Sequence, residues 1–256
     1  MKMLLSYLVV LVFLAGCGRQ AKIVEQPFQL DLSPELQSID SLLQQRPDSA
    51  LMRLIEFQPA DHYRSLLLSE ALYKTDNTQQ NRDDLLAAMC YFDSLAAQHP
   101  DNDDLTLLSA RSHYMNGVGY YENDSIVDAC REYLHTLEIM EGHFNEEDLV
   151  GYKAKFLGLT YTRLGSTLFY HITAQASIDS YKKAAYYFSK IYYSGLANTY
   201  RCIGNSYKLD NNNDSALVYF RKALVLARKQ NIISAQFWTL TQAAPLYYDL
   251  GYRDSA

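Results

Sequence analysis

A run of carboxylate and amide side chains, Asp210-Asn211-Asn212-Asn213-Asp214, opens like a calcium-binding loop. Such a loop needs glycine at its sixth position and a bidentate glutamate at its twelfth, but Ser215 and Arg221 stand there. His143 precedes an acidic run at 146–148, yet no second histidine lies at helical spacing to complete a metal site. G-x-S-x-G, a phosphate-binding glycine loop and H-E-x-x-H do not occur either. We therefore predict no metal, no cofactor and no catalysis.

Cys17 is the residue whose neighbours specify a covalent reaction. Lys2 and an apolar run from Leu4 to Leu14 precede it, and that run is too short to span a bilayer as a helix. The pattern is typical of an export signal. The ending Leu14-Ala15-Gly16-Cys17 resembles the lipobox of bacterial lipoproteins. This resemblance implies a signal peptide at 1–16, cleavage before Cys17, a membrane anchor of palmitate-type lipid on its sulfur, and a tether over 17–33. The alternative is an ordinary secretory signal with an incidental cysteine.

The residues after Cys17 bear on the membrane that would receive the anchor. Gly18 occupies the position where an aspartate would resemble an inner-membrane retention signal. The acidic cluster that resembles a surface-display signal is also missing from this stretch. We therefore expect the periplasmic face of the outer membrane, and surface display remains an alternative.

Composition excludes several classes of protein. The chain has 23 Lys and Arg against 29 Asp and Glu, a net charge of −6, which argues against nucleic acid as the main partner. It has 11 glycines and 6 prolines but 22 tyrosines and 10 phenylalanines, which favours helices packed through large side chains. Cys90, Cys130 and Cys202 match no zinc spacing and fall in apolar-periodic segments, so we expect all three to be buried.

From Leu36 onward, apolar residues recur every three or four positions, which predicts amphipathic helices throughout. The clearest block reads Tyr200-x2-Ile203-Gly204-x2-Tyr207-x8-Ala216-x3-Phe220-x2-Ala223. The same slots hold Tyr161, Leu164, Gly165, Tyr181 and Ala184; then Gly117, Tyr120, Ala129 and Tyr133; and, after the block, Leu240, Ala243, Ala244, Tyr247 and Ala256. Small residues let two helices approach closely, and aromatic residues fill the space between successive pairs.

This pattern resembles the tetratricopeptide repeat (TPR), a helix pair that normally recurs about every 34 residues. The resemblance covers residues 34–256 and implies an all-α, right-handed superhelical solenoid of about five antiparallel helix pairs, the last incomplete. Pro245 falls inside an expected first helix, where it removes a hydrogen bond. The final unit stops at Ala256, in the first turn of its second helix, so we expect the protein to continue.

The motif Asp-Ser-Ala occurs at 48–50, 214–216 and 254–256. We interpret its Asp or Ser as the N-terminal cap of the following helix. It also resembles an O-glycosylation sequon of one bacterial phylum, which remains an alternative.

In such arrays the first helix of each pair lines a concave groove, and polar residues between the packing positions face a partner. Arg201 and Asn205 are four residues apart, on one helix face, and resemble half of the carboxylate clamp of some TPR domains. Gln242 stands where that clamp has asparagine. The alternative is a solvated helix face. The predicted partner-binding residues are Arg111, Tyr114, Tyr121, Arg163, Asn198, Arg201, Asn205, Lys208 and Trp238.

The whole chain resembles the TPR lipoproteins of the Bacteroidetes, many of which continue into a membrane span, a coiled coil or a DNA-binding domain. We therefore predict a non-catalytic scaffold or sensor that binds a protein or peptide and, in this segment, no nucleic acid. One alternative is an outer-membrane assembly factor of the TPR lipoprotein type, which Phe92-x2-Leu95-x4-Pro100 resembles. Another is a glycan-binding lipoprotein of the starch-utilisation type.

Overall fold

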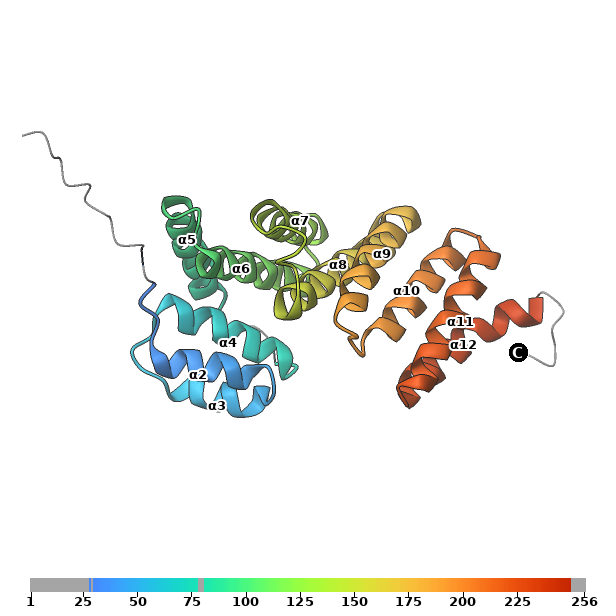
Figure 1. Cartoon of the computed structure of the whole chain (residues 1–256), viewed down its shortest axis with the longest axis horizontal. Coiled ribbons are helices and arrows are strands. Elements are labelled where there is room, and N and C mark those ends of the chain that lie inside the picture. The colour runs from blue at the N-terminus through green and yellow to red at the C-terminus, as the bar shows by residue number, and fades with distance from the viewer. Residues whose placement is uncertain (1–27, 29, 78–80, 250–256) are drawn as a thin grey trace, which may run out of the picture.

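The computed structural model describes residues 28, 30–77 and 81–249, which form eleven α-helices and no strand (Figure 1). The helices are α2 (Pro34–Leu43), α3 (Pro47–Glu56), α4 (His62–Lys74), α5 (Arg82–Gln98), α6 (Asp103–Glu122), α7 (Ile126–His143), α8 (Gly151–His171), α9 (Ala174–Lys190), α10 (Leu196–Leu209), α11 (Asn213–Lys229) and α12 (Ile233–Asp249). Short connections join them into five pairs, α2/α3 to α10/α11, and α12 begins a sixth unit. The predicted all-α solenoid is confirmed. None of the described helices is long and apolar enough to cross a bilayer.

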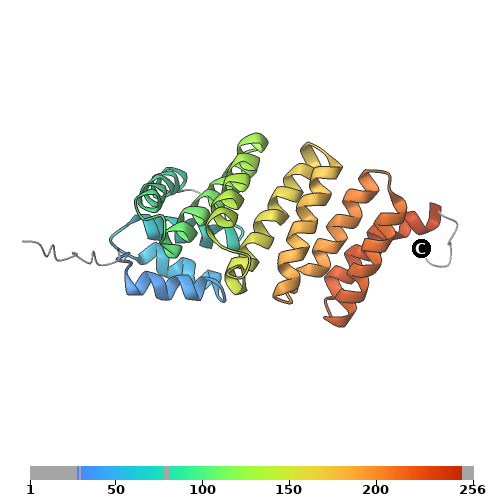
Figure 2. The same cartoon turned by 45° about the horizontal axis from the view of Figure 1, so that its top comes forward.

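The helices from α8 to α12 lie side by side in a row, whereas α2, α3 and α4 gather at the N-terminal end (Figure 2). Helix α6 packs mainly between α5 and α7 and also against α4, so nearly every side chain from Leu105 to Gly119 is buried. The sequence pattern predicted one buried face for α6, as in a surface helix. The structure instead surrounds α6 with neighbours on all sides.

The register of three of the pairs follows from a glycine on the first helix and an aromatic residue sixteen positions later on the second. A Cβ atom on Gly204 would lie 2.7 Å from the ring of Phe220, and one on Gly117 would lie 2.8 Å from that of Tyr133. Gly165 has the same relation to Tyr181, at 3.0 Å. The predicted close approach of the helices at these glycines is therefore confirmed in three successive pairs.

We expect Gly204→Leu to destabilise the fold by about 1–3 kcal/mol, because the new side chain would overpack the ring of Phe220. Urea unfolding followed by circular dichroism measures this cost. The matched control is Gly142→Ala on α7, where a Cβ atom would meet nothing within 4 Å. That control should leave stability unchanged or raised, since alanine favours helix more than glycine does. Equal midpoints for the two variants would show that the assigned register is wrong.

The predicted helix caps at 48–50 and 214–216 are wrong, and so is the predicted burial of Cys90. Asn212 caps α11 by accepting a hydrogen bond from the backbone N–H of Ser215 at 3.1 Å, while Asp214 already lies inside the helix. The N-cap of α3 is Arg46, without a side-chain bond, so Asp48 does not cap that helix.

Cys90 is exposed, whereas Cys130 is buried and Cys202 half-buried. Burial raises the pKa of the Cys130 and Cys202 thiols, which makes both less reactive.

Candidate functional site

The first helices of successive units share one surface, and side chains bridge neighbouring helices across it. The guanidinium carbon of Arg163 on α8 lies 4.9 Å from the centroid of the Tyr73 ring on α4. Nη1 of Arg201 on α10 donates a hydrogen bond to Oε1 of Gln242 on α12, at 3.1 Å. We call this surface the inner face. The name covers the residues of these two contacts, namely Tyr73, Arg163, Arg201 and Gln242. It also covers Lys74 and Lys155, which line a cavity with Tyr73, and Asn205 and Trp238, one helical turn from Arg201 and Gln242.

Arg201 occupies the centre of the α10 part of the inner face. Its side chain is half-buried, and its Nε atom is buried without a hydrogen-bond partner in the described part of the chain. No described carboxylate forms an ion pair with it; the one hydrogen bond found for its guanidinium goes to the uncharged amide of Gln242. Asn205, one turn further along α10, is also half-buried. Both side chains are therefore only partly accessible, and Gln242 of α12 contacts Arg201.

The inner face is basic although the chain as a whole is acidic. Neither α8 nor α10 contains an aspartate or glutamate. Burial lowers the pKa of Arg163, and burial likewise lowers that of Lys74 in spite of the nearby Glu70. A lowered pKa of a basic group means that its charged form is poorly solvated, so an anion bound beside it recovers the lost free energy. This arrangement suits a ligand that carries carboxylates.

Arg111 and Tyr114 require a correction, since they were predicted to face a partner and both are buried. The N-terminal helices α2 and α4 lie over this part of α6 and fill the space in which a partner would sit. The Tyr114 ring packs edge-on against Phe156, with centroids 5.4 Å apart. Neither residue is therefore placed on an exposed surface of α6.

The guanidinium of Arg111 makes four hydrogen bonds to two carboxylates. Nη1 and Nη2 donate to Asp40 at 2.7 and 2.8 Å, and Nε and Nη2 donate to Glu70 at 2.7 and 3.1 Å. The hydroxyl of Tyr63 also donates to Asp40, at 2.7 Å. Burial would raise the pKa of Asp40, but the charge and hydrogen bonds of Arg111 outweigh it and lower that pKa. The network joins α2, α4 and α6 and uses four of the five N–H donors of the guanidinium.

The other predicted residues occupy varied positions. Asn198 and Trp238 are exposed, and the Trp238 ring packs edge-on against Phe237. Lys208 is half-buried, and Tyr121 packs against the core. Cys17 lies outside the described residues.

Sequence reasoning missed three members of the inner face, namely Tyr73, Lys74 and Lys155. The first two lie on α4, where the repeat pattern was weakest, so no register was available to orient them. Lys155 precedes the first repeat slot of its unit. Together with Tyr114 and Tyr152 they line a small cavity between α4, α6 and α8. The absence of acidic residues from α8 was the signal that could have identified Lys155.

A second buried ion cluster has a structural role. His113 lies 3.1 Å from Asp93 through Nε2 and 2.6 Å from Glu132 through Nδ1. Burial alone would lower the pKa of His113, but the hydrogen bonds and charges of both carboxylates raise it to about 9. Both ring nitrogens are therefore occupied in joining α5, α6 and α7. Within the described ranges, no group of three or more His, Cys, Asp and Glu is placed to hold a metal ion.

The pairing of helices and their shared inner face define an α-helical repeat solenoid. No protein-family model and no curated protein matches the sequence. Among solved structures, the chain is similar to an ATPase of the STAND class with a tetratricopeptide repeat sensor from Pyrococcus horikoshii. The TM-score is 0.64 at 15% identity, over 86% of this chain but only 31% of that one.

Two further solved structures are similar. The apo form of RapI gives a TM-score of 0.57 at 13% identity, with 84% of this chain and 82% of that one covered. BtubC (BKLC) from P. vanneervenii gives 0.53 at 14% identity, with 78% and 76% covered. The fold is thus TPR-like, as the repeat pattern predicted.

Proposed function

We propose that this chain is a non-catalytic, lipid-anchored scaffold or sensor that binds the carboxylate-bearing end of a peptide or protein on its inner face. The observation that carries this proposal is Arg201, which is half-buried, has an unsatisfied buried Nε and lacks a carboxylate partner in the described chain. An unsatisfied buried donor costs about 1–3 kcal/mol, which a bound acceptor would recover.

A carboxylate is the ligand that best fits this group. Guanidinium binds carboxylate through two parallel hydrogen bonds, and these charge-assisted bonds are about twice as strong as neutral ones. Asn205 supplies a neutral donor one turn away, and Gln242 orients the guanidinium through Nη1. Lys74, Lys155 and Arg163 extend the positive potential along the same face, so acidic residues preceding the terminal carboxylate are also favoured.

The test compares peptides with a free and an amidated C-terminus on a peptide array. We expect wild-type protein to prefer the free carboxylate. We expect Arg201→Ala with Asn205→Ala to remove that preference and weaken binding at least tenfold, which corresponds to about 1.4 kcal/mol. Melting should change little, because the double variant loses only one described hydrogen bond, from Arg201 to the amide of Gln242. Arg131→Ala with Asn145→Ala, both exposed and on other elements, is the control. Undiminished binding by the Arg201 and Asn205 variant would remove the inner face from consideration.

The membrane anchor is proposed on Cys17 from the lipobox resemblance. We expect wild-type protein to incorporate radiolabelled palmitate and to partition into detergent, since buried methylenes each contribute about 0.8 kcal/mol. Cys17→Ser should abolish labelling and release the protein or leave it unprocessed. A mature N-terminus other than Cys17 in the wild type would contradict the proposal. Fractionation of inner and outer membranes then tests the proposed place on the periplasmic face of the outer membrane.

A further inference from the structure

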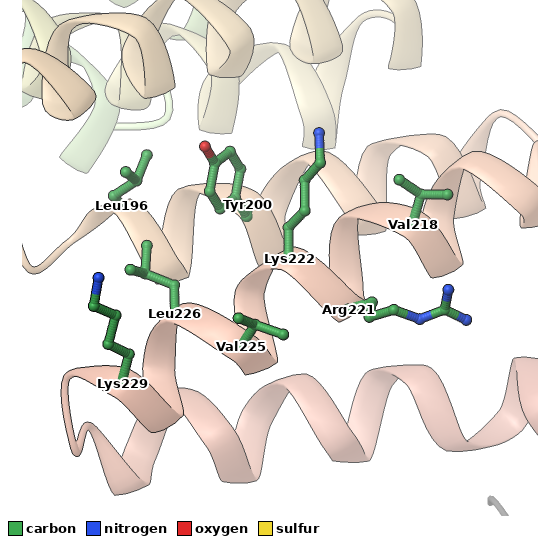
Figure 3. A pocket seen from close by; sticks show the side chains of 8 residues that line it. All are labelled: Leu196, Tyr200, Val218, Arg221, Lys222, Val225, Leu226 and Lys229. Carbon is green, nitrogen blue, oxygen red and sulfur yellow. The ribbon is translucent and has the colours of Figure 1, made fainter.

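A second groove lies between α10 and α11, away from the inner face (Figure 3). Its volume is about 630 Å³, within the range of sites that accept ligand side chains. Leu196 and Tyr200 contribute from α10, and Val218, Val225 and Leu226 contribute from α11. The side chains of Leu196, Tyr200 and Leu226 extend toward the same space (Figure 3). We call this feature the outer groove.

The outer groove and the inner face occupy opposite sides of α10. Successive residues of an α-helix are rotated by about 100°, so Leu196 and Tyr200 lie within about 40° of each other. By the same geometry, Arg201 and Asn205 are centred about 140° away from them. A ligand on one surface therefore approaches α10 from a different side than a ligand on the other.

Two of the apolar side chains of the outer groove, Val218 and Val225, lie outside the described core, whereas Leu196, Tyr200 and Leu226 also pack against it. The buried side of α11 consists of Ala216, Phe220, Ala223 and Ala227, each with no exposed area. Val218 and Val225 lie on the other side and are 48% and 63% exposed. Exposed aliphatic residues that line a recess, rather than being scattered singly, are typical of an interaction site.

Positive charges line this recess without a carboxylate partner among the described residues. Arg221, Lys222 and Lys229 line the outer groove and are exposed, and no described carboxylate forms an ion pair with any of them. Lys222 instead lies over the ring of Tyr219, 4.7 Å from its centroid. The segment 180–229 contains nine Lys and Arg but two Asp and Glu, a net charge of +7 in a chain whose total is −6. The outer groove therefore lies in the basic part of the chain, and three of these nine basic residues line it.

We propose that the outer groove binds an acidic amphipathic helix of a partner protein. The recess accepts aliphatic side chains, which favours an inserted helix face over a planar lipid surface. Arg221 and Lys229 are eight residues apart, which places them about 12 Å apart along α11. A partner helix with carboxylates two turns apart and aliphatic residues between them matches both features. Charge complementarity without internal ion pairs makes such binding fast and sensitive to salt.

The proposal is tested by selecting random displayed peptides on the wild-type protein. We expect the enriched peptides to combine Asp or Glu with aliphatic residues at helical spacing. Arg221→Glu with Lys222→Glu should weaken these peptides at least tenfold, and Val225→Asp should do so as well. All three positions are exposed, so the variants should retain the wild-type circular dichroism spectrum and melting temperature. The controls are Arg131→Glu and Val127→Asp on α7, which is exposed at both positions.

Three outcomes would overturn the proposal. One is selection of peptides that lack acidic residues, or of acidic peptides that bind the variants as tightly as the wild type. Another is co-sedimentation with vesicles of anionic lipid that the groove variants abolish, in the absence of peptide binding, since the surface would then serve a membrane. The third is a wild-type dimer in sedimentation velocity that Val225→Asp dissociates, which would make a second copy the occupant. Loss of carboxylate binding at Arg201 leaves this test unaffected.

Discussion

Arg111→Met should destabilise the fold by about 3–5 kcal/mol, because it leaves two carboxylates near each other in a buried site without their counter-ion. The side chain of Arg111 is 5% exposed and is the charged partner of both Asp40 and Glu70. Methionine fills much of the volume but donates no hydrogen bond. The substitution should mainly weaken the packing of α2 and α4 against α6, since these are the helices that the network joins. Urea unfolding gives the total, and hydrogen exchange of peptides from residues 34–74 locates it.

The pH dependence of this variant is a further check. In wild type the pKa of Asp40 is lowered, so its contribution is present above its unfolded pKa and is lost as the pH falls through the folded value. Without Arg111, burial raises the pKa of that carboxyl instead, and protonation relieves the strain. The stability difference between wild type and Arg111→Met should therefore shrink as the pH falls toward 4.

Two comparisons make the result specific to the buried network. Arg131→Met removes an ion pair to Asp128 whose arginine side chain is 68% exposed, and it should cost less than about 1 kcal/mol. Adding Asp40→Asn and Glu70→Gln to Arg111→Met should recover part of the loss, since neutral amides tolerate burial better than charges do. A cost for Arg111→Met as small as that of the control would contradict a structural role for the network.

Phe220→Ala should cost about 3–5 kcal/mol, because its ring is fully buried at the junction of three helices. The ring covers Gly204 of α10 and belongs to the same core cluster as Ala243 and Leu246 of α12. Its removal leaves a cavity that the glycine cannot fill. In a solenoid each unit is stabilised mainly by its neighbours, so hydrogen exchange should rise first in α12 and then in α11.

Val225→Ala on the same helix is the control for this substitution. Its side chain is 63% exposed, so the change should alter stability by less than about 0.5 kcal/mol. The pair with Gly204 offers a second check, because Gly204→Ala should be destabilising in wild type but better tolerated with Phe220→Ala. Additive costs for that pair would indicate that the two residues do not touch.

The repeat part of the fold was predictable because its information is local. Gly204 and Phe220 are sixteen residues apart, within one helix pair, and the same pairing recurs at Gly117 with Tyr133 and at Gly165 with Tyr181. Each small residue must lie opposite a large one for two helices to pack at close range. This constraint fixes the number of residues between the small and the large residue, so the repetition of that spacing along the sequence was enough to identify the pairs.

The candidate site was predictable only in part. The helical spacing of Arg201 and Asn205 placed them on one face, and they remain on the inner face in the structure. Their degree of burial depended on α12, and the partner of Arg201 turned out to be Gln242, 41 residues away. The charge of the outer groove was visible in the composition of 180–229, but its apolar lining required knowing which side of α11 packs against the core.

The amino-acid sequence by itself determined the all-α class, the paired helices and their register, because helical periodicity and glycine–aromatic packing act over one or two dozen residues. It also determined the lipobox-like surroundings of Cys17, which are a contiguous motif. Only the tertiary structure decided the fate of Arg111, since Asp40 lies 71 residues earlier and Glu70 lies 41 residues earlier. The physical reason is that a charged side chain on a helix can form the same hydrogen bonds with a carboxylate of its own chain as with a carboxylate of a partner. Which of the two it meets depends on how distant helices pack, and no local pattern encodes that choice.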